Sequence, residues 1–437
     1  MHPEQILAAC TALVGQVIKF DHPADAVVSR FFKDNRNLGP RERATLAETA
    51  YNVLRKKALY DAFALGAPKG SGARERKLAI LGFFGPRDFV KASLTDLEKN
   101  WLDACDAVNP ADPDSGLLEL HRHNLPEWLA TALKTQLGDD FWPLIETLNS
   151  AAPLDIRINS FTTKREAAQK DLSREGIKAL PTPYSPWGLR VQGRPSVNKL
   201  KVFTCGDIEV QDEGSQLLAL LVDAKRGEMV VDFCAGAGGK TLALGAMMRS
   251  TGRLYAFDTS AHRLDALKPR VARSGLSNVQ TAAITHERDE RVKRLAGKID
   301  RVLIDAPCSG LGTLRRNPDL KWRQKPSDVA ELNAKQTAIL QSAARLLKPG
   351  GRLVYATCSV LPEENEAIAE AFSAANKDFT PLECGELLTQ LKVEGVAGDK
   401  GLCSGPVDAP TRYLRLWPHR HGTDGFFAAV WQKNAAV

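Results

Sequence analysis

Long apolar runs are absent from this sequence. No stretch approaches the roughly 20 consecutive apolar residues that a membrane-spanning helix requires. The first residues, MHPEQILAACTALVGQVIKF, also lack the basic start and the cleavage site of a secretory signal peptide. We therefore expect a cytoplasmic protein.

Closely spaced cysteines are absent as well. The eight cysteines are scattered along the chain, and no two of them form a C-x-x-C pair. This spacing indicates neither a disulfide framework nor a zinc knuckle, so we expect no metal. Each thiol is then either a small core residue or a chemically reactive group.

The size and the charge of the chain set wider limits. A chain of 437 residues is too long for one ordinary core, so two or three domains are expected. An apolar fraction of 43% with 25% charged residues is typical of a soluble globular protein. The net charge of +7 is compatible with a polyanionic partner without requiring one.

The first part of the chain has a helical pattern. Apolar residues recur at helical spacing through ILAACTALVGQVI and RATLAETAYNVLRKKALYDAFAL, which predicts a helical domain over residues 1–110. The basic and aromatic stretch SRFFKDNRNLGPRER lies between them, either as a solvated loop or as an RNA contact. The proline- and acid-rich stretch VNPADPDSG predicts a linker.

Two further segments follow. Residues 117–205 begin with a short helical part and continue with LDIRINSF and GLRVQG, which alternate as strands do, around the helical TKREAAQKDLSREG. This order predicts a small α/β module. In residues 206–437, short β-rich runs (MVVDFC, RLYAFD, VQTAAI, RVLIDA, RLVYAT) alternate with helical segments, which predicts a mostly parallel sheet covered by helices on both faces.

Four chemically distinctive residues come at the ends of these predicted strands. They are Cys234, Asp258, Asp305 and Cys358. Ligands of open α/β sheets bind at the carboxyl ends of the strands, so these residues are expected to meet in one crevice.

The turn after the first of these strands reads DFCAGAGGKT. A P-loop would need glycine where Cys234 stands, and a G-x-G-x-x-G dinucleotide fingerprint would need glycine where Thr241 stands. What remains is a nucleoside-type cofactor whose carboxylate meets a glycine loop at a helix N-terminus, and S-adenosylmethionine fits this description. The loop runs from Cys234 through Ala235, Gly236, Ala237, Gly238 and Gly239 to Lys240.

Asp258 lies about 20 residues after this loop, at the tip of the second strand, where an acid accepts hydrogen bonds from ribose hydroxyls. The alternative is that Asp258 caps the helix that begins in SAHRLDAL. The glycine loop favours the ribose role.

Four motifs in the order DFCAGAGGKT, DAPCSGLGTLRRNPDLKW, ATCSVLPEENE and PHRHGTDGFF resemble the Sun/RsmB-like family of RNA cytosine-C5 methyltransferases, in its bacterial small-subunit rRNA branch. The stretches RFFKDNRNLGPRER and AETAYNVLR resemble the NusB-like RNA-binding domain of that branch. The resemblance implies a Rossmann-like catalytic domain, an RRM-like module in the middle segment, and S-adenosylmethionine as the cofactor. The family loop usually reads C-A-A-P-G-G-K, whereas Gly236 and Ala237 stand here in place of alanine and proline.

The resemblance also implies roles for single residues. It implies that the loop residues Cys234 to Lys240 contact the cofactor together with Asp258, Arg263 and Asp305. No residue is assigned where the family commonly has an aspartate near the adenine, since His286 and Glu287 both stand there. Carbon 5 of cytosine is a poor nucleophile, so a thiolate adds to carbon 6 first. In this family the cysteine of the T-C motif is the nucleophile, which implies Cys358, and Cys308 of the P-C motif then assists product release. DNA methyltransferases use the P-C cysteine instead, and that assignment stays as the alternative.

Asp305 has two candidate duties, which are holding the cofactor and hydrogen bonding to the polar edge of the cytosine. The Lys240 ammonium either faces solvent or stands in the active site, where it would lower a thiolate pKa or orient Asp305, and the resemblance favours the second position.

A basic stretch directly follows the P-C motif. The target base has to leave its stack, so single-stranded or looped RNA is expected. The residues expected to bind it are Arg315, Arg316, Lys321, Trp322 and Arg323, with an ordinary basic surface loop as the alternative. The function expected overall is methylation of a cytosine in small-subunit rRNA. Transfer RNA is the alternative substrate. A non-catalytic RNA-binding ribosome assembly factor with a methyltransferase fold is the alternative function.

Overall fold

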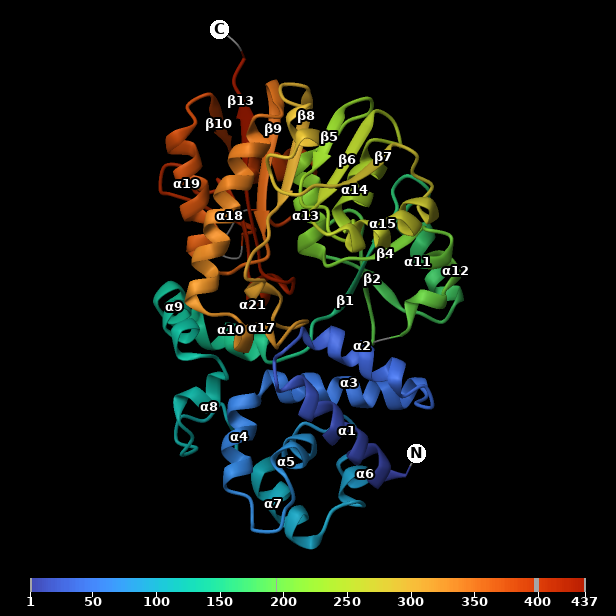
Figure 1. Cartoon of the computed structure of the whole chain (residues 1–437), viewed down its shortest axis with the longest axis vertical. Helices are drawn as coiled ribbons and strands as arrows, with labels where there is room; N and C mark the ends of the chain where they lie inside the picture. Colours follow the sequence, from blue (N-terminus) through green and yellow to red (C-terminus); the bar gives the residue numbers. More distant parts are fainter. Residues whose placement is uncertain (1, 194, 397–400, 436–437) are drawn as a thin grey trace. The chain divides into compact units, whose positions relative to one another are not determined.

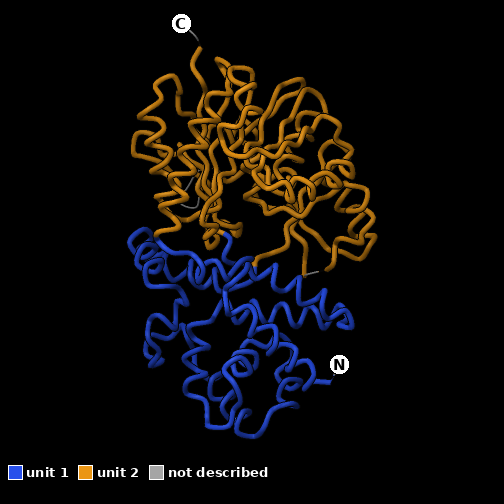
Figure 2. Tube along the Cα trace, in the orientation of Figure 1, with its two compact units in different colours: residues 1–151, 313–326 blue, residues 152–312, 327–437 orange. Residues whose placement is uncertain are grey.

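The computed structural model describes residues 2–193, 195–396 and 401–435. Figure 2 shows that they form two compact units, the first made of residues 1–151 and 313–326 and the second of residues 152–312 and 327–437. Segment 313–326 therefore folds with the first unit, although its neighbours on both sides along the chain belong to the second. Within the described ranges, no helix is both long and apolar enough to cross a membrane.

The first unit is helical, as its sequence pattern predicts. In the first helix the apolar positions at helical spacing are all buried, namely Ile6, Leu7, Cys10, Leu13, Val14 and Val17. The helices are α1 (Pro3–Val17), α2 (Ala24–Asp34), α3 (Pro40–Arg55), α4 (Lys57–Leu65), α5 (Arg74–Leu81), α6 (Arg87–Lys91), α7 (Asp96–Asp106), α8 (Glu119–His123), α9 (Glu127–Leu137), η1 (Gly138–Asp140), α10 (Phe141–Leu148) and α17 (Leu320–Arg323).

The expected middle segment, residues 117–205, is divided between the units. Its helices α8 to α10 belong to the first unit and its strands to the second. Its last strand, Ile208–Val210, lies beyond the expected boundary at 205, because three residues are too few to show an alternating pattern. The helical part and the strand part of this segment are thus different structural units.

The small module has the ferredoxin-like order of strands and helices, in agreement with the expected α/β unit. Its elements are β1 (Leu154–Ile158), α11 (Arg165–Arg174), β2 (Ala179–Pro181), β3 (Gly188–Val191), η2 (Val197–Lys199), α12 (Lys201–Thr204) and β4 (Ile208–Val210). The strands pair antiparallel in the order β2-β3-β1-β4. Glu209 of β4 accepts hydrogen bonds from Arg270 and Arg273, which ties the module to the larger domain.

The larger domain is Rossmann-like, and the fold class expected from the sequence is confirmed. Strands β5 to β9 pair in parallel in the order β9-β8-β5-β6-β7. The sheet then continues past β9 with antiparallel strands that the sequence analysis did not identify. The strands are β5 (Met229–Asp232), β6 (Arg253–Asp258), β7 (Val279–Ala283), β8 (Ile299–Asp305), β9 (Leu347–Thr357), β10 (Phe379–Leu382), β11 (Cys403–Ser404), β12 (Tyr413–Leu416) and β13 (Phe426–Lys433).

Helices cover this sheet on both faces (Figure 1). On one face Leu340, Ile368 and Phe372 of α18 and α19 pack on the sheet. On the other face Leu221, Leu244 and Leu388 of α13, α14 and α20 do the same. The helices of the domain are α13 (Glu213–Val222), α14 (Gly239–Met247), α15 (Ala261–Arg273), α16 (Glu290–Lys293), η3 (Leu311–Thr313), α18 (Pro326–Ala344), η4 (Pro362–Glu364), α19 (Glu366–Ala375), α20 (Cys384–Gln390) and α21 (Pro418–His421).

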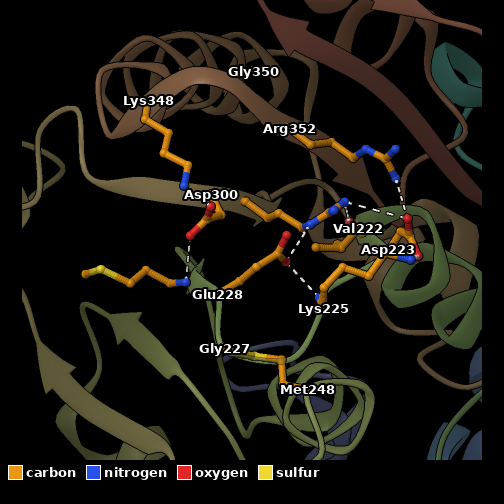
Figure 3. A network of polar contacts seen from close by, with 12 residues as sticks. Val222, Asp223, Lys225, Gly227, Glu228, Met248, Asp300, Lys348, Gly350 and Arg352 are labelled. Carbon is orange, nitrogen blue, oxygen red and sulfur yellow. Dashed lines mark hydrogen bonds and ion pairs between the residues drawn. The ribbon is translucent and has the colours of Figure 1, made fainter.

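A network of charged side chains closes the amino ends of the parallel strands. Figure 3 shows Lys348 of β9 beside Asp300 of β8, and Arg352 of β9 beside Asp223, which directly follows α13. Glu228, before β5, lies between these two pairs. Arg301 Nε lies 2.7 Å from Glu228 Oε2, and Arg301 Nη1 donates to the carbonyl oxygen of Val222 at 2.9 Å. Opposite charges therefore tie the starts of the strands to the end of the helix that packs on them.

Candidate active site

The four distinctive residues of the sequence do meet at one edge of the sheet. Asp258 and Asp305 are the last residues of β6 and β8, and Cys358 directly follows β9. Cys234 follows β5 by two residues. Because β5, β6, β8 and β9 run parallel and in register, their carboxyl ends lie together.

The glycine loop between β5 and α14 is built for close approach of a ligand. Gly236 and Gly238 have φ of +55° and +86°, a conformation that favours glycine. A Cβ on Gly238 would come within 2.0 Å of Leu267 Cδ1, whereas a Cβ on Gly236 would meet open space. The loop thus packs tightly on α15 on one side and leaves free room on the other.

Asp258 holds this loop in place. Its Oδ2 accepts from the backbone N–H of Gly236 at 2.8 Å, and its Oδ1 accepts from the N–H of Ser260 at 2.7 Å. The N-cap of α15 is Ser260, whose side chain accepts from the N–H of Arg263. Asp258 therefore does not cap the helix, and the role at the cofactor loop is the remaining prediction.

A second carboxylate, Asp232, lies under the loop. It is 1% exposed, and Thr241 Oγ1 donates to its Oδ2 at 2.7 Å. Its Oδ1 has no hydrogen-bond partner among the described residues. Burial raises the pKa of this carboxyl to about 7, so Asp232 is a poorly compensated acid beside the loop.

Lys240 and Asp305 form an ion pair at the centre of the edge. Lys240 Nζ lies 2.5 Å from Asp305 Oδ2, and the two side chains are 11% and 30% exposed. Burial alone would lower the pKa of the Lys240 ammonium, but the neighbouring Asp305 outweighs it and raises that pKa. Lys240 thus stays charged, while part of Asp305 remains open to a ligand.

The two cysteines of the sequence motifs are in contact. Cys308 Sγ and Cys358 Sγ are 3.4 Å apart, and both thiols are free and partly buried. The hydrogen bond to Cys358, followed by burial, raises the pKa of Cys308 well above its ordinary value. The charge of Cys358 also contributes to the raised pKa of Lys240. The ion pair and the thiol pair therefore belong to one electrostatic site.

A buried carboxylate that the sequence analysis overlooked links the two cysteine loops. Glu364 is 0% exposed and accepts from the N–H of Ser309 at 2.8 Å and from Ser309 Oγ at 2.5 Å. It also accepts from Ser359 Oγ and, at 3.0 Å, from Gln336 Nε2. Each serine directly follows one of the cysteines. The signal for Glu364 was the acidic run after the T-C motif, which reads as a solvated helix start when no partner is visible.

Only part of the basic stretch after the P-C motif is exposed to solvent, as RNA binding would require. Lys321 is 1% exposed, its Nζ donates to the carbonyl oxygen of Arg55 at 2.7 Å, and burial lowers its pKa to about 7. Arg315 is 5% exposed, and the indole N–H of Trp322 donates to the carbonyl oxygen of Leu54 at 2.8 Å. The expectation of a phosphate contact from Lys321 is corrected accordingly, since a buried ammonium that binds protein oxygens is shielded from phosphate, whereas the phosphate contact of Arg315 stays a prediction.

The other predicted residues take these positions. Arg316, Trp322 and Arg323 are partly exposed, so their RNA contacts stay a prediction. Arg263 is exposed on α15. His286 is exposed after β7, where its Nδ1 accepts from the N–H of Arg288.

Glu287 and Cys234 complete the set: the contact near the adenine stays unassigned between His286 and Glu287, and the cofactor contact of Cys234 stays a prediction. The carbonyl oxygen of Glu287 accepts from Ser342 Oγ. Burial raises the pKa of Cys234 well above its ordinary value, so this thiol is a packing group rather than a reactive one. In the part of the chain that the structure describes, no cluster of three or more His, Cys, Asp or Glu could hold a metal ion.

The family comparison matches two regions of the chain. Residues 219–432 match the family model described as 16S rRNA methyltransferase RsmB/F. Residues 125–198 match the ferredoxin-like domain of the RsmF/B-like methyltransferases. The second match spans helices α9 and α10 of the first unit and the first strands of the module.

Named relatives and solved structures agree with this match. A probable ribosomal RNA small subunit methyltransferase B of Synechocystis sp. is 33% identical over 71% of this chain and 67% of its own length. The corresponding probable enzyme of Bacillus subtilis is 30% identical over 81% of this chain and 76% of its own length.

Among solved structures, that of PH0851 has a TM-score of 0.76 at 27% identity and covers 99% of both chains. A methyltransferase homologue from Pyrococcus horikoshii has a TM-score of 0.61 at 28% identity and covers 72% of this chain and 97% of its own.

Proposed function

Because the chain belongs to the RsmB/F family of S-adenosylmethionine-dependent RNA methyltransferases, we propose that it methylates carbon 5 of a cytosine in small-subunit ribosomal RNA. The observation that carries this proposal is the contact of Cys308 and Cys358, 3.4 Å apart at the carboxyl edge of the sheet. Carbon 5 becomes nucleophilic only after a thiolate has added to carbon 6, and resolving that adduct requires a second group close by.

The cofactor would be held by the glycine loop and Asp258. The free room at Gly236, its N–H within 2.8 Å of Asp258 Oδ2, and the N-terminus of α14 fit a nucleoside with a carboxylate. S-adenosylmethionine supplies the methyl group as an electrophilic carbon bonded to a sulfonium. Asp258→Ala should therefore weaken cofactor binding in calorimetry by about tenfold or more, as expected for loss of charge-assisted hydrogen bonds. Unchanged affinity would limit Asp258 to shaping the loop.

Cys358 is the nucleophile in this proposal. Its thiolate sulfur bonds to carbon 6 of the cytosine, and the displaced electron pair makes carbon 5 able to take the methyl group. Lys240 contributes its positive charge at the site, and Asp305, which is 30% exposed, accepts from the polar edge of the base.

Cys308 resolves the adduct because its environment changes during the reaction. The largest cause of its raised pKa is the hydrogen bond with Cys358, and the Cys358 charge contributes as well. Once Cys358 is bonded to carbon 6 it is a neutral thioether, so both contributions vanish, while burial and the charge of Glu364 still raise the pKa of Cys308. The proposal requires that Cys308 pass its proton to water before it acts as the base. The Cys308 thiolate then takes the proton from carbon 5, the sulfur–carbon 6 bond breaks, and its electron pair returns to Cys358.

The experiment that tests this assignment is a denaturing gel. We incubate S-adenosylmethionine and small-subunit RNA with the wild type, with Cys308→Ala or with Cys358→Ala. The gel then shows whether a protein–RNA band survives denaturation. We expect a trapped adduct with Cys308→Ala, none with Cys358→Ala, and a loss of methyl transfer of about 10³-fold or more in the Cys358 variant. The reverse pattern would make Cys308 the nucleophile. If wild type methylates transfer RNA but leaves small-subunit RNA unmethylated, the proposal that small-subunit RNA is the substrate is overturned.

A further inference from the structure

The two cysteine loops come from different strands and need a device that keeps them together. The P-C loop follows β8 and the T-C loop follows β9, and the thiols sit on the loops rather than on the strands. The Gly312 N–H donates to the Cys358 carbonyl oxygen at 2.8 Å and joins the two loops through the backbone. The side chains packed behind the sulfurs join them a second time, and the sulfurs are 3.4 Å apart.

Glu364 fills the space behind the sulfurs and binds both loops with one carboxylate. Its oxygens accept from the N–H and Oγ of Ser309 and from Ser359 Oγ, and the two serine hydroxyls are 3.2 Å apart. Since Ser309 and Ser359 each follow a cysteine, the carboxylate fixes the backbone one residue away from each sulfur.

A helix completes the arrangement. Gln336 of α18 is 0% exposed, and its Nε2 donates both to Glu364 Oε1 and to the carbonyl oxygen of Pro307, at 3.0 Å each. Pro307 directly precedes Cys308. Tyr355 of β9 donates through its hydroxyl to the backbone carbonyl oxygen of Glu364 at 2.6 Å. The clamp made of Glu364, Ser309, Ser359 and Gln336 is thus anchored on α18 and β9.

We propose that Glu364 is the positioning residue that sets the distance between Cys308 and Cys358. It has no solvent exposure and does not touch the reacting atoms, so it acts through the loops that it binds. The inference rests on the proposed function, because the distance matters for the step in which Cys308 takes the carbon 5 proton from the adduct on Cys358. Displacing reacting groups by about 1 Å can cost on the order of 10²-fold in rate.

The test compares two substitutions of the same residue. Glu364→Ala removes the clamp. Glu364→Gln keeps it in part, because the amide oxygen accepts from Ser309 N–H while the amide NH₂ can donate to the two serine hydroxyls. A positioning role predicts a fall in kcat of about 10²-fold for alanine with unchanged KM. It also predicts substantial rescue by glutamine.

A second readout measures the thiol distance without RNA or cofactor. Phenylarsine oxide bridges two neighbouring thiols, since its arsenic bonds to both sulfurs while its oxygen leaves as water with the two thiol protons. Peptide mapping should find the Cys308–Cys358 bridge in wild type and in Glu364→Gln, and about tenfold slower bridging in Glu364→Ala, since bridging depends on proximity. Cys308→Ala gives the background.

Glu213→Ala is the matched control for loss of a buried glutamate. Glu213 is also 0% exposed, and it accepts from the N–H groups of Tyr184 and Ser185 at 2.6 and 2.7 Å. It lies on α13, away from both cysteine loops in the sequence. Its variant should be less stable but should bridge its cysteines at the wild-type rate.

The outcomes separate the two proposals. Wild-type bridging in Glu364→Ala, with kcat within about twofold of wild type, overturns the positioning role. If Glu364→Ala does not fold, Ser309→Ala carries the same test with a smaller effect, and normal bridging with normal kcat in that variant overturns the role too. If wild type methylates no cytosine, the proposed function fails, while the bridging rates still decide what Glu364 does.

Discussion

The two ends of the same parallel strands carry similar residues to different effect. At the amino end, Arg301 lies between Glu228, at 2.7 Å, and Asp223, at 3.7 Å, and all three side chains are less than one-fifth exposed. At the carboxyl end, Asp305 pairs with Lys240 but is 30% exposed, and Asp232 keeps an oxygen without a partner among the described residues.

The difference lies in how completely the polar groups are satisfied. The charges of the amino end bind one another and the end of α13 (Figure 3). The carboxyl end leaves hydrogen-bonding capacity unused, which destabilises the folded protein and is characteristic of a site that completes itself with a ligand. Burial of charge by itself therefore does not identify an active site.

Lys240→Met should produce the largest effect, on activity. Removing the ammonium beside Asp305 and Cys358 should lower kcat by about 10²-fold, as for loss of one preorganised charge in an active site. Methyl transfer to RNA measures it. The matched control is Lys268→Met, which breaks a 2.8 Å ion pair with Asp265 on the exposed side of α15 and should leave kcat unchanged. If the activity of Lys240→Met stays within threefold of wild type, the charges at the carboxyl end serve catalysis no more than those at the amino end do.

Arg301→Met should produce the next effect, on stability alone. It leaves Glu228 and the Val222 carbonyl oxygen without their partner and should lower the free energy of unfolding by about 2 kcal/mol. Urea denaturation measures this change, and kcat per folded molecule should not move. Arg226→Met, at an exposed arginine of the same turn, should stay within about 0.5 kcal/mol of wild type. A fall in kcat with Arg301→Met would mean that the amino end also serves catalysis.

Asp232→Asn should produce an effect of another kind, a change in the pH dependence of stability. Burial raises the pKa of Asp232 from 3.8 to about 7, helped by Asp305 and Asp258 and opposed by Thr241 and Lys240. The folded protein then holds a proton that the unfolded chain releases, so the contribution of Asp232 to stability is greatest below pH 3.8 and is lost as pH rises to about 7.

Asparagine has no such proton to lose. The stability of the Asp232→Asn variant relative to wild type should rise between pH 4 and 7, by at most about 1.4 kcal/mol per pH unit, and stay level above pH 7. Urea denaturation of both proteins across this range measures the slope. A difference that does not change with pH would show that Asp232 is as well compensated as the charges of the amino end.

Much of the site follows from local sequence. Alternation of apolar runs with helical segments places Asp258, Asp305 and Cys358 at strand ends, and parallel strands bring their ends to one edge. The glycines of the cofactor loop are equally local, because a positive φ is a property of one residue. The family and the fold class are therefore readable before any coordinates are known.

The hydrogen-bond partners of each side chain, in contrast, do not follow from the local sequence. Glu364 lies in an acidic run whose pattern is that of a solvated helix start, and only packing beneath two loops makes it a buried acceptor. Lys321 lies in a basic run typical of a phosphate-binding loop, yet its ammonium donates to the Arg55 carbonyl oxygen. The local sequence does not decide either outcome, because Ser309 and Arg55, which bind these side chains, are distant along the chain.

The sequence alone determined the alternation of parallel strands with helices, the glycine loop and the pair of motif cysteines, since these depend on backbone preferences and on spacing along the chain. The tertiary structure decided that the two sulfurs stand 3.4 Å apart, that Glu364 joins their loops, and that segment 313–326 folds with the first unit. Those features depend on which distant groups come together, and burial then turns an ordinary charge into either a structural pair or an unsatisfied group at a site.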